Sequence, residues 1–209
     1  MPPEVLRDDA ISPEVIASDV VFDGKVWDIR RDTFTLDGDE ITREYMDHTG
    51  AVAVLAMDER DRVLLIKQYR HPVRSRDWEL PAGLLDFDDE SPLDAAKREL
   101  AEEVDLVAEN WDLLSEFMTS PGGSNEVIRV YLARGVSAAP EVFVRTEEEA
   151  GIELRWVPLD EVADAVLARE LQNSILAIAV MSAVAGRARG WSTLAPAESD
   201  WPRHPLART

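Results

Sequence analysis

Three glutamates spaced for one face of a helix are the residues of this chain best placed to do chemistry. Glu99, Glu102 and Glu103 stand at positions i, i+3 and i+4, so a helix would project all three side chains together. Their repulsion costs on the order of a few tenths of a kcal/mol per close pair, and magnesium or manganese would remove that cost because both prefer oxygen ligands and also bind phosphates. The spacing indicates a metal–diphosphate site, although by itself it fits a solvated acidic helix face better.

The string around this triad carries more information than the triad alone. Gly83 and Glu90 precede it, seven residues separate Glu90 from Arg98, and an Arg-Glu-Leu-Ala-Glu-Glu run ends at Glu103. This order resembles the Nudix box: Gly, five residues, Glu, seven residues, Arg-Glu, an apolar residue, any residue, Glu-Glu, any residue, Gly and an apolar residue. Six residues here separate Gly83 from Glu90, and Asp105 replaces the last glycine. We expect Asp105 to end the helix in a left-handed conformation, which Asp tolerates better than most residues.

The resemblance extends over roughly residues 18–190 and is to the ADP-ribose pyrophosphatase branch of the family. The segment Trp78-Glu-Leu-Pro-Ala-Gly-Leu84 is similar to the strand that enters the box in that branch, and Pro121 lies fifteen residues beyond Leu106, where the branch places a proline. The resemblance implies divalent-metal-dependent hydrolysis of the diphosphate of ADP-ribose to AMP and ribose 5-phosphate. Mg2+ is the implied cofactor, with Mn2+ as a substitute.

The same resemblance implies a role for each residue of the metal site. Glu99, Glu102, Glu103 and the backbone carbonyl of Ala82 would ligate two or three metal ions. Arg98 would orient a ligand carboxylate without touching the metal. Glu103 and Arg98 are therefore counted among the catalytic residues.

The resemblance also implies a general base in a loop before a late strand. Three consecutive glutamates, Glu147, Glu148 and Glu149, occupy that place. Alignment back from Trp156 favours Glu148, with Glu149 next, while an exposed acidic loop remains the plain structural alternative. Glu90 is expected to support the loop and the acidic cluster.

Substrate contacts are implied on both sides of the box. Arg70 and Glu126 would hold the sugar-phosphate part, and Arg43 of a second chain would help to cover the adenine, with Phe22 as a weaker stacking candidate. In this branch the N-terminal strands, here residues 18–47, build a homodimer. The resemblance therefore implies a homodimer that binds a small nucleoside diphosphate sugar.

Two other functions stay open. One is hydrolysis of another nucleoside diphosphate sugar or of a dinucleoside polyphosphate, for which the lengthened loop after Gly83 leaves room. The other is a binding or regulatory module without chemistry, which could dispense with the three glutamates. The sequence contains no Gly-x-Ser-x-Gly, no phosphate loop ending in Gly-Lys-Ser/Thr and no Gly-x-Gly-x-x-Gly.

A helix over residues 90–104 must position the glutamates. Ser91 is a suitable N-cap, Pro92 fits the first helical position, and Asp94 completes a capping box. Apolar side chains recur at helical spacing and predict the buried face: Leu93, Ala96, Leu100 and Val104.

Strands surround this helix in the chain. Asp23-Gly24 and Asp37-Gly38 are hairpin turn signals. Strands are predicted at residues 18–23, 25–36, 40–47, 51–57, 62–68, 111–118, 126–133 and 152–157, and further helices at 159–171 and 173–187.

This order predicts an α+β fold, an α/β/α sandwich with a mixed β-sheet between helices. The resemblance identifies it as the Nudix fold. We expect residues 1–47 to form an N-terminal arm and β-strand dimerisation region, 48–190 the hydrolase domain, and 191–209 an extended C-terminal tail.

Composition narrows the function classes. The 209 residues contain 42 acidic and 22 basic side chains, a net charge of −20, so binding to nucleic acid or to an anionic membrane is not expected. The absence of cysteine excludes disulfides and thiolate chemistry and fits a reducing compartment. With no apolar run long enough to span a bilayer and no basic start before an apolar segment, we expect a cytoplasmic protein.

Overall fold

The computed structural model describes residues 6–87, 89–141, 143 and 151–204. The chain divides into two compact units. The first comprises Met1–His48 and Gly122–Asn125, and the second comprises Thr49–Pro121 and Glu126–Thr209.

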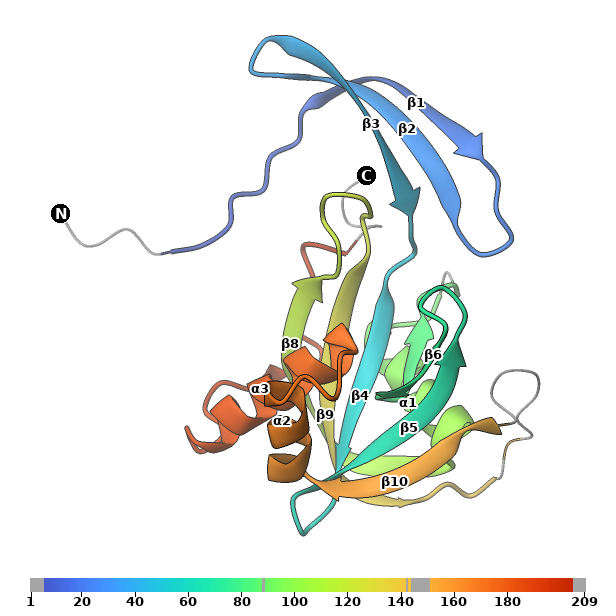
Figure 1. Cartoon of the computed structure of the whole chain (residues 1–209). Helices are drawn as coiled ribbons and strands as arrows, with labels where there is room; N and C mark the ends of the chain where they lie inside the picture. The colour runs from blue at the N-terminus through green and yellow to red at the C-terminus, as the bar shows by residue number, and fades with distance from the viewer. Residues whose placement is uncertain (1–5, 88, 142, 144–150, 205–209) are drawn as a thin grey trace, which may run out of the picture. The chain divides into compact units, whose positions relative to one another are not determined.

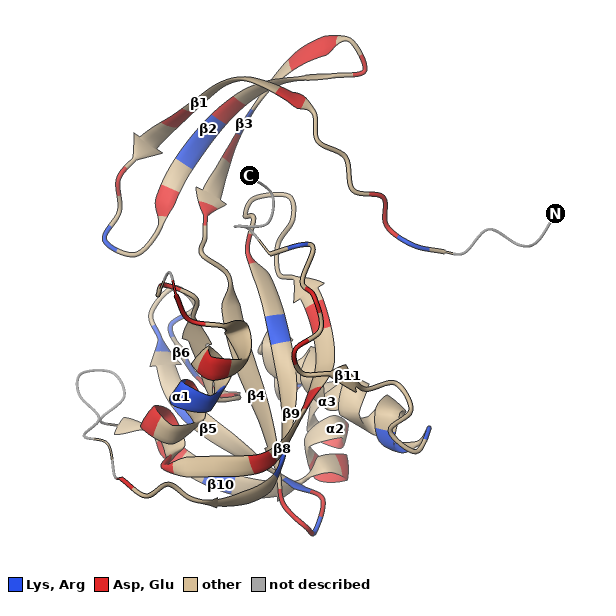
Figure 2. Cartoon of the chain, turned by 180° about the vertical axis from the view of Figure 1, so that it is seen from behind, with Lys and Arg blue, Asp and Glu red and all other residues tan. Residues whose placement is uncertain are grey.

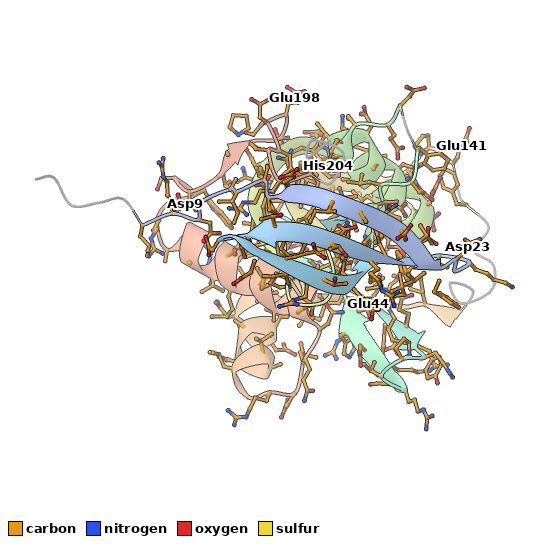
Figure 3. The ribbon with its side chains drawn as sticks, turned by 90° about the horizontal axis from the view of Figure 1, so that it is seen from above. Asp9, Asp23, Glu44, Glu141, Glu198 and His204 are labelled. Carbon is orange, nitrogen blue, oxygen red and sulfur yellow. The ribbon has the colours of Figure 1, made fainter. Side chains whose placement is uncertain are left out.

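Three antiparallel strands form the first unit. β1 (Glu14–Phe22) pairs with β2 (Asp28–Leu36), which pairs with β3 (Asp39–Asp47). Figure 3 shows β2 between its two neighbours. The predicted turn at Asp37-Gly38 is present, and both residues have positive φ, at 53° and 90°. That combination is the type I′ turn that joins two strands through two residues.

Polar side chains connect the strands of this small sheet. Arg30 Nε donates to Asp47 Oδ2 at 2.8 Å, and the Tyr45 hydroxyl donates to Asp32 Oδ2 at 3.0 Å. Burial and the bond to Asp32 raise the pKa of Tyr45 to about 12. Tyr45 is therefore a neutral hydrogen-bond donor at physiological pH.

A mixed eight-stranded sheet forms the second unit, in the order β10-β5-β4-β9-β8-β11, with β6 added beside β5 and β7 beside β4. The strands are β4 (Ala51–Met57), β5 (Arg62–Arg70), β6 (Ser75–Glu79), β7 (Ala82–Leu84), β8 (Leu106–Met118), β9 (Val127–Ala138), β10 (Glu153–Pro158) and β11 (Ala195–Pro196). The β4–β9 pair is parallel and the other pairs are antiparallel.

Helices cover both faces of this sheet (Figure 1). α1 (Pro92–Val104) packs on one face, and α2 (Leu159–Leu167) and α3 (Ser174–Arg187) pack on the other. β4 is buried along its whole length, so its side chains serve the two cores alternately. The predicted α+β sandwich with a mixed sheet between helices is confirmed.

The signals that predicted α1 are present at both of its ends. Ser91 Oγ accepts a hydrogen bond from the Asp94 backbone N–H at 3.1 Å, and Pro92 takes the first helical position. Asp105 ends the helix with φ 54° and ψ 38°, the expected left-handed conformation. Leu93, Ala96, Leu100 and Val104 are buried, as their spacing predicted.

The C-terminal segment completes the α1 face beside β8 and β9. The Arg129 guanidinium, with 2% of the residue exposed, donates to the carbonyl oxygens of Ser199 at 2.8 Å and Asp200 at 3.0 Å. Its Cζ lies 4.7 Å from the ring centroid of Trp201, which is itself buried in the α1-side core. The C-terminal segment around Ser199, Asp200 and Trp201 is therefore packed into the folded part of this unit.

Three strands were not predicted: β6, β7 and the two-residue β11, which lies in the segment expected to be an extended tail. β6 and β7 have no alternating apolar pattern, and β7 contains Gly83, which has a low strand preference. Their extended conformation comes from pairing: β6 folds back on β5, the strand just before it in the chain, and β7 pairs with the more distant β4. The helices of the described chain all fall short of what a bilayer crossing requires.

We expect Trp201→Ala to lower the free energy of unfolding by about 3–5 kcal/mol, because it removes a large buried ring and leaves a cavity beside Arg129. Urea denaturation followed by circular dichroism measures this. Leu167→Ala, which shortens an exposed side chain on α2, is the control and should change the stability by less than about 0.5 kcal/mol. Equal stability of the two variants would contradict the docking of the C-terminal segment.

Candidate active site

The three glutamates of α1 lie together, with a basic residue among them. Figure 2 shows the basic band between acidic bands along this helix. Glu103 is buried, Glu99 is largely covered and Glu102 is the most accessible of the three. The helix thus presents carboxylates that differ in their contact with solvent.

Close packing of β7 on α1 explains the glycine at the start of the motif. Gly83 pairs with Val52 of β4, and a Cβ atom added to Gly83 would lie 2.0 Å from the Glu99 carboxyl carbon. No side chain fits there without moving that carboxylate. The backbone φ of Gly83 is not positive, so a left-handed conformation does not explain the glycine. It is required because strand and helix approach so closely.

The backbone next to Gly83 holds the buried glutamate. The Ala82 N–H donates to Glu103 Oε2 at 2.9 Å, and Ala82 pairs with Ala53 of β4. The side chain of Glu103 and the peptide of Ala82 are therefore fixed against each other. Glu103 is one of the four groups that the family resemblance implies as metal ligands, and the carbonyl of the same Ala82 is another.

Arg98 links the remaining carboxylates. Its Nε and Nη2 each donate to one oxygen of Glu90 at 2.8 Å, and its Nη1 donates to Glu99 Oε1 at 2.5 Å and Glu102 Oε2 at 3.1 Å. The ring of Phe87 covers the guanidinium, with 5.0 Å between Cζ and the ring centroid. Arg98 therefore acts as the internal counter-charge of the cluster.

This network shifts the acid–base behaviour of its members. The hydrogen bonds from Arg98 lower the pKa of Glu90, and hydrogen bonding to Glu90 together with the charge of Glu99 raises the pKa of Arg98. Because Glu90 stays ionised into the acidic range, the Glu90–Arg98 pair persists there as well.

The cluster has the donor chemistry of a divalent-metal site, although its geometry is that of an ion-pair network. Within the described part of the chain, no three acidic or histidine side chains are arranged to hold a metal. The reason is local: Arg98 engages Glu99 and Glu102, and the Ala82 N–H engages Glu103. The hard oxygen donors, and the cradle that Gly83 leaves open for Glu99, fit a magnesium-like cation.

The substrate residues suggested by the sequence lie in different parts of the structure. Arg70 ends β5 and pairs with Glu79 of β6. Glu126 directly precedes β9 and accepts a hydrogen bond from the Thr119 hydroxyl at 2.5 Å. Arg43 lies in β3 of the first unit, where it donates to the Thr42 carbonyl at 2.8 Å.

Two further candidates complete this set. Phe22 is exposed at the end of β1 in the first unit. The proposed base Glu148, with its neighbours Glu147 and Glu149, lies outside the described residues.

Glu79 is a charged residue to which the sequence motif assigned no role. It is buried, with Arg70 and Gln68 as hydrogen-bond partners. The available signal was an acidic residue within the apolar run Trp-Glu-Leu-Pro that leads into the motif. A buried acid of this kind needs a partner, but the sequence does not say which one.

Comparison with known proteins places the chain in a family. The model described as the NUDIX domain matches residues 47–177. The chain is 42% identical to an ADP-ribose pyrophosphatase of Mycobacterium tuberculosis, over 93% of each chain. It is 34% identical to an ADP-ribose pyrophosphatase of Bacillus subtilis, over 82% of this chain and 92% of the relative.

Two other comparisons extend this result. The chain is 33% identical to a methanol dehydrogenase activator of Bacillus methanolicus, over 80% of this chain and 90% of the relative. A solved structure of an ADP compounds hydrolase superposes with a TM-score of 0.71 at 19% identity, covering 88% of this chain and all of the other. At that identity the superposition supports the fold.

We expect Gly83→Ala to leave the protein folded but to weaken divalent-metal binding by about tenfold. The added methyl group would displace the Glu99 carboxylate, which lies at the end of a flexible side chain. Isothermal titration with Mn2+ measures the affinity, and circular dichroism checks the fold. Gly122→Ala, whose methyl group would meet no atom within 4 Å, is the matched control. Unchanged Mn2+ affinity in Gly83→Ala would separate Glu99 from the metal site.

Proposed function

This chain belongs to the Nudix family, and from that premise we propose that it hydrolyses the diphosphate of ADP-ribose to AMP and ribose 5-phosphate with a divalent cation. The observation that carries the proposal is the 42% identity to an ADP-ribose pyrophosphatase over 93% of each chain. The clustering of Glu99, Glu102 and Glu103 on α1 supports it, because diphosphate hydrolysis needs clustered hard ligands.

Glu99, Glu102, Glu103 and the Ala82 carbonyl would hold the cation, for which Mg2+ is the proposed ion and Mn2+ a substitute. A divalent cation bound there would offset the charge that builds up on the diphosphate and lower the pKa of a coordinated water. The hydrogen bond from the Ala82 N–H supports this ligand set, since it holds the Glu103 carboxylate beside the residue whose carbonyl is the fourth proposed ligand.

Arg98 would keep these carboxylates oriented when the cation takes over as their main counter-charge. Its two bonds to Glu90 anchor one side of the guanidinium, while Nη1 reaches the ligand carboxylates. Glu90 therefore supports the site through Arg98. Glu90 and Arg98 would thus contact the metal ligands and not the metal itself, and residues in that position commonly fix the geometry of the ligands.

Three side chains are proposed to act on the substrate itself. Arg70 and Glu126 would hold the sugar-phosphate part, and Glu148 would take a proton from the attacking water. Arg70 is partly exposed at the end of β5, which suits contact with a phosphate. The assignment of Glu148 rests on its place in the sequence before β10.

We also propose a homodimer built through β1, β2 and β3. Val15, Val20 and Phe22 of β1 are exposed in the isolated chain, and a second copy would bury such apolar side chains. In that assembly Arg43, with Phe22 as a weaker candidate, would cover the adenine bound to the other subunit.

A second candidate is another nucleoside diphosphate sugar or a dinucleoside polyphosphate. The observation that favours it is the additional residue between Gly83 and Glu90, in the loop that places Phe87 over Arg98. A longer loop changes the wall of the site without changing the acidic cluster.

A substrate panel separates these candidates. With Mg2+ present, kcat/KM for ADP-ribose should exceed that for other nucleoside diphosphate sugars and for dinucleoside polyphosphates by at least about tenfold. AMP and ribose 5-phosphate should form in equal amounts. Negligible ADP-ribose turnover alongside rapid turnover of another diphosphate would favour the second candidate, and no turnover of any would favour a non-catalytic module.

Glu103→Gln should lower kcat by at least about a hundredfold, because the amide loses the charge needed to bind a cation. The fold should persist, since the amide oxygen can still accept from the Ala82 N–H. Steady-state kinetics with thermal denaturation measures both effects. Glu161→Gln, which neutralises an exposed acid on α2, should retain full activity, and a near-normal rate in Glu103→Gln would remove the proposed metal site.

A further inference from the structure

A charged side chain lies in the interior beside β5. Glu79 has 5% of its side chain exposed, and its carboxylate accepts hydrogen bonds from Arg70 and Gln68. Arg70 Nε lies 3.0 Å from Oε1, Arg70 Nη2 lies 2.7 Å from Oε2, and Gln68 Nε2 lies 3.1 Å from Oε2. Both carboxylate oxygens are therefore engaged.

Strand register explains why these three side chains meet. Ile66 of β5 pairs with Glu79 of β6, and Gln68 and Arg70 follow Ile66 at intervals of two. Residues at that spacing share one face of a strand, and Ile66 belongs to the α1-side core. Glu79, Gln68 and Arg70 consequently lie on the sheet face that carries α1.

The two charges of the pair differ in their contact with solvent. The Arg70 side chain is 44% exposed, compared with 5% for Glu79. The bonds use the Nε–Nη2 edge of the guanidinium, so its plane is fixed by a side-on contact. The structure therefore holds a rigid cation whose outer part meets solvent and whose inner part is attached to the core.

Stability alone explains such a pair poorly. Removing a carboxylate from water carries a large desolvation penalty, and an apolar residue of similar volume commonly stabilises an interior as well or better. What the pair provides is orientation, because a long arginine side chain otherwise samples many rotamers. Ordering that side chain in advance reduces what a ligand must supply when it binds.

The position of Glu79 in the chain connects it to the acidic cluster. Three residues later, Ala82 donates to Glu103, and between them the Pro81 carbonyl accepts from the Val54 N–H at 2.8 Å. The short segment from Glu79 to Ala82, which joins β6 to β7, is thus held at one end by Arg70 and Gln68 and at the other by Glu103. Because β5 runs antiparallel to β4, Arg70 ends β5 at the same end of the sheet as Ala51, which pairs with Leu84.

We propose that Glu79 is a positioning residue that holds Arg70 in place to bind a phosphate oxygen in the ribose 5-phosphate half of the substrate. This inference rests on the proposed hydrolysis of ADP-ribose. Glu79 acts through Arg70, and the bond-breaking step does not involve it. Its loss therefore acts on KM more than on kcat.

A double-mutant cycle tests this role. Glu79→Gln should raise KM for ADP-ribose about tenfold and change kcat less than about threefold. In an Arg70→Ala background, Glu79→Gln should leave KM unchanged, because the side chain it positions is gone. An equal rise of KM in both backgrounds would overturn the inference.

Arg70→Lys guards against loss of folding in Arg70→Ala, which would leave the Glu79 charge buried without its arginine. Lysine keeps the charge but lacks the planar fork, so KM should rise and adding Glu79→Gln should change it little; a further tenfold rise would count against the inference. Asp112→Asn, which removes a carboxylate paired with Arg134 on the same sheet, is the control and should leave KM unchanged.

The stability of the same variants gives an independent readout. Arg70→Ala should lower the melting temperature, and adding Glu79→Gln should restore part of the loss, although KM stays at the Arg70→Ala value. Parallel changes in melting temperature and KM would indicate a purely structural pair and reject the inference. A wild-type enzyme with no ADP-ribose turnover would reject the proposed function and the inference together, whereas failure of the cycle in an active enzyme rejects only the inference.

Discussion

The concentration of negative charge on one face of α1 is the constraint on which the rest of the site depends. Glu99, Glu102 and Glu103 repel one another, and two different groups of the structure compensate their charges. Arg98 bridges the first two, and the Ala82 N–H binds the third. The helix keeps this face because α1 is capped at both ends and its opposite face is buried.

β4 makes these compensations possible. It pairs with β9 over its whole length, but with β5 only near Met57, and so leaves room for β7 beside Ala51–Ala53. β7 in turn brings Gly83 against Glu99. β4 is buried between hydrophobic cores on both faces of the sheet. It thus sets the distance between β7, which carries Ala82, and α1, which carries the glutamates.

The sequence predicts the local parts of this arrangement well. Ser91, Pro92 and Asp105 determine the ends of α1 through contacts within a few residues, and Asp37-Gly38 determines a two-residue turn. β6 and the role of Glu79 depend instead on pairing with the preceding strand β5, and β7 depends on pairing with the more distant β4, so no pattern inside β6 or β7 reveals them. Arg129 is a similar case, because it bonds Glu116 on the neighbouring strand and also the carbonyl oxygens of Ser199 and Asp200, which lie about seventy residues away.

The loop between β8 and β9 limits where this protein can be divided into modules. Gly122–Asn125 belongs to the N-terminal unit, where backbone bonds join Met46 to Gly123 and Asn125, and the Asn125 side chain binds Asp47 and the His48 N–H. The polypeptide therefore crosses between the units three times. Excising the first forty-eight residues would strip this loop of its hydrogen-bond partners, so gene fragmentation, domain shuffling or fusion at that boundary would cut through a shared structural element.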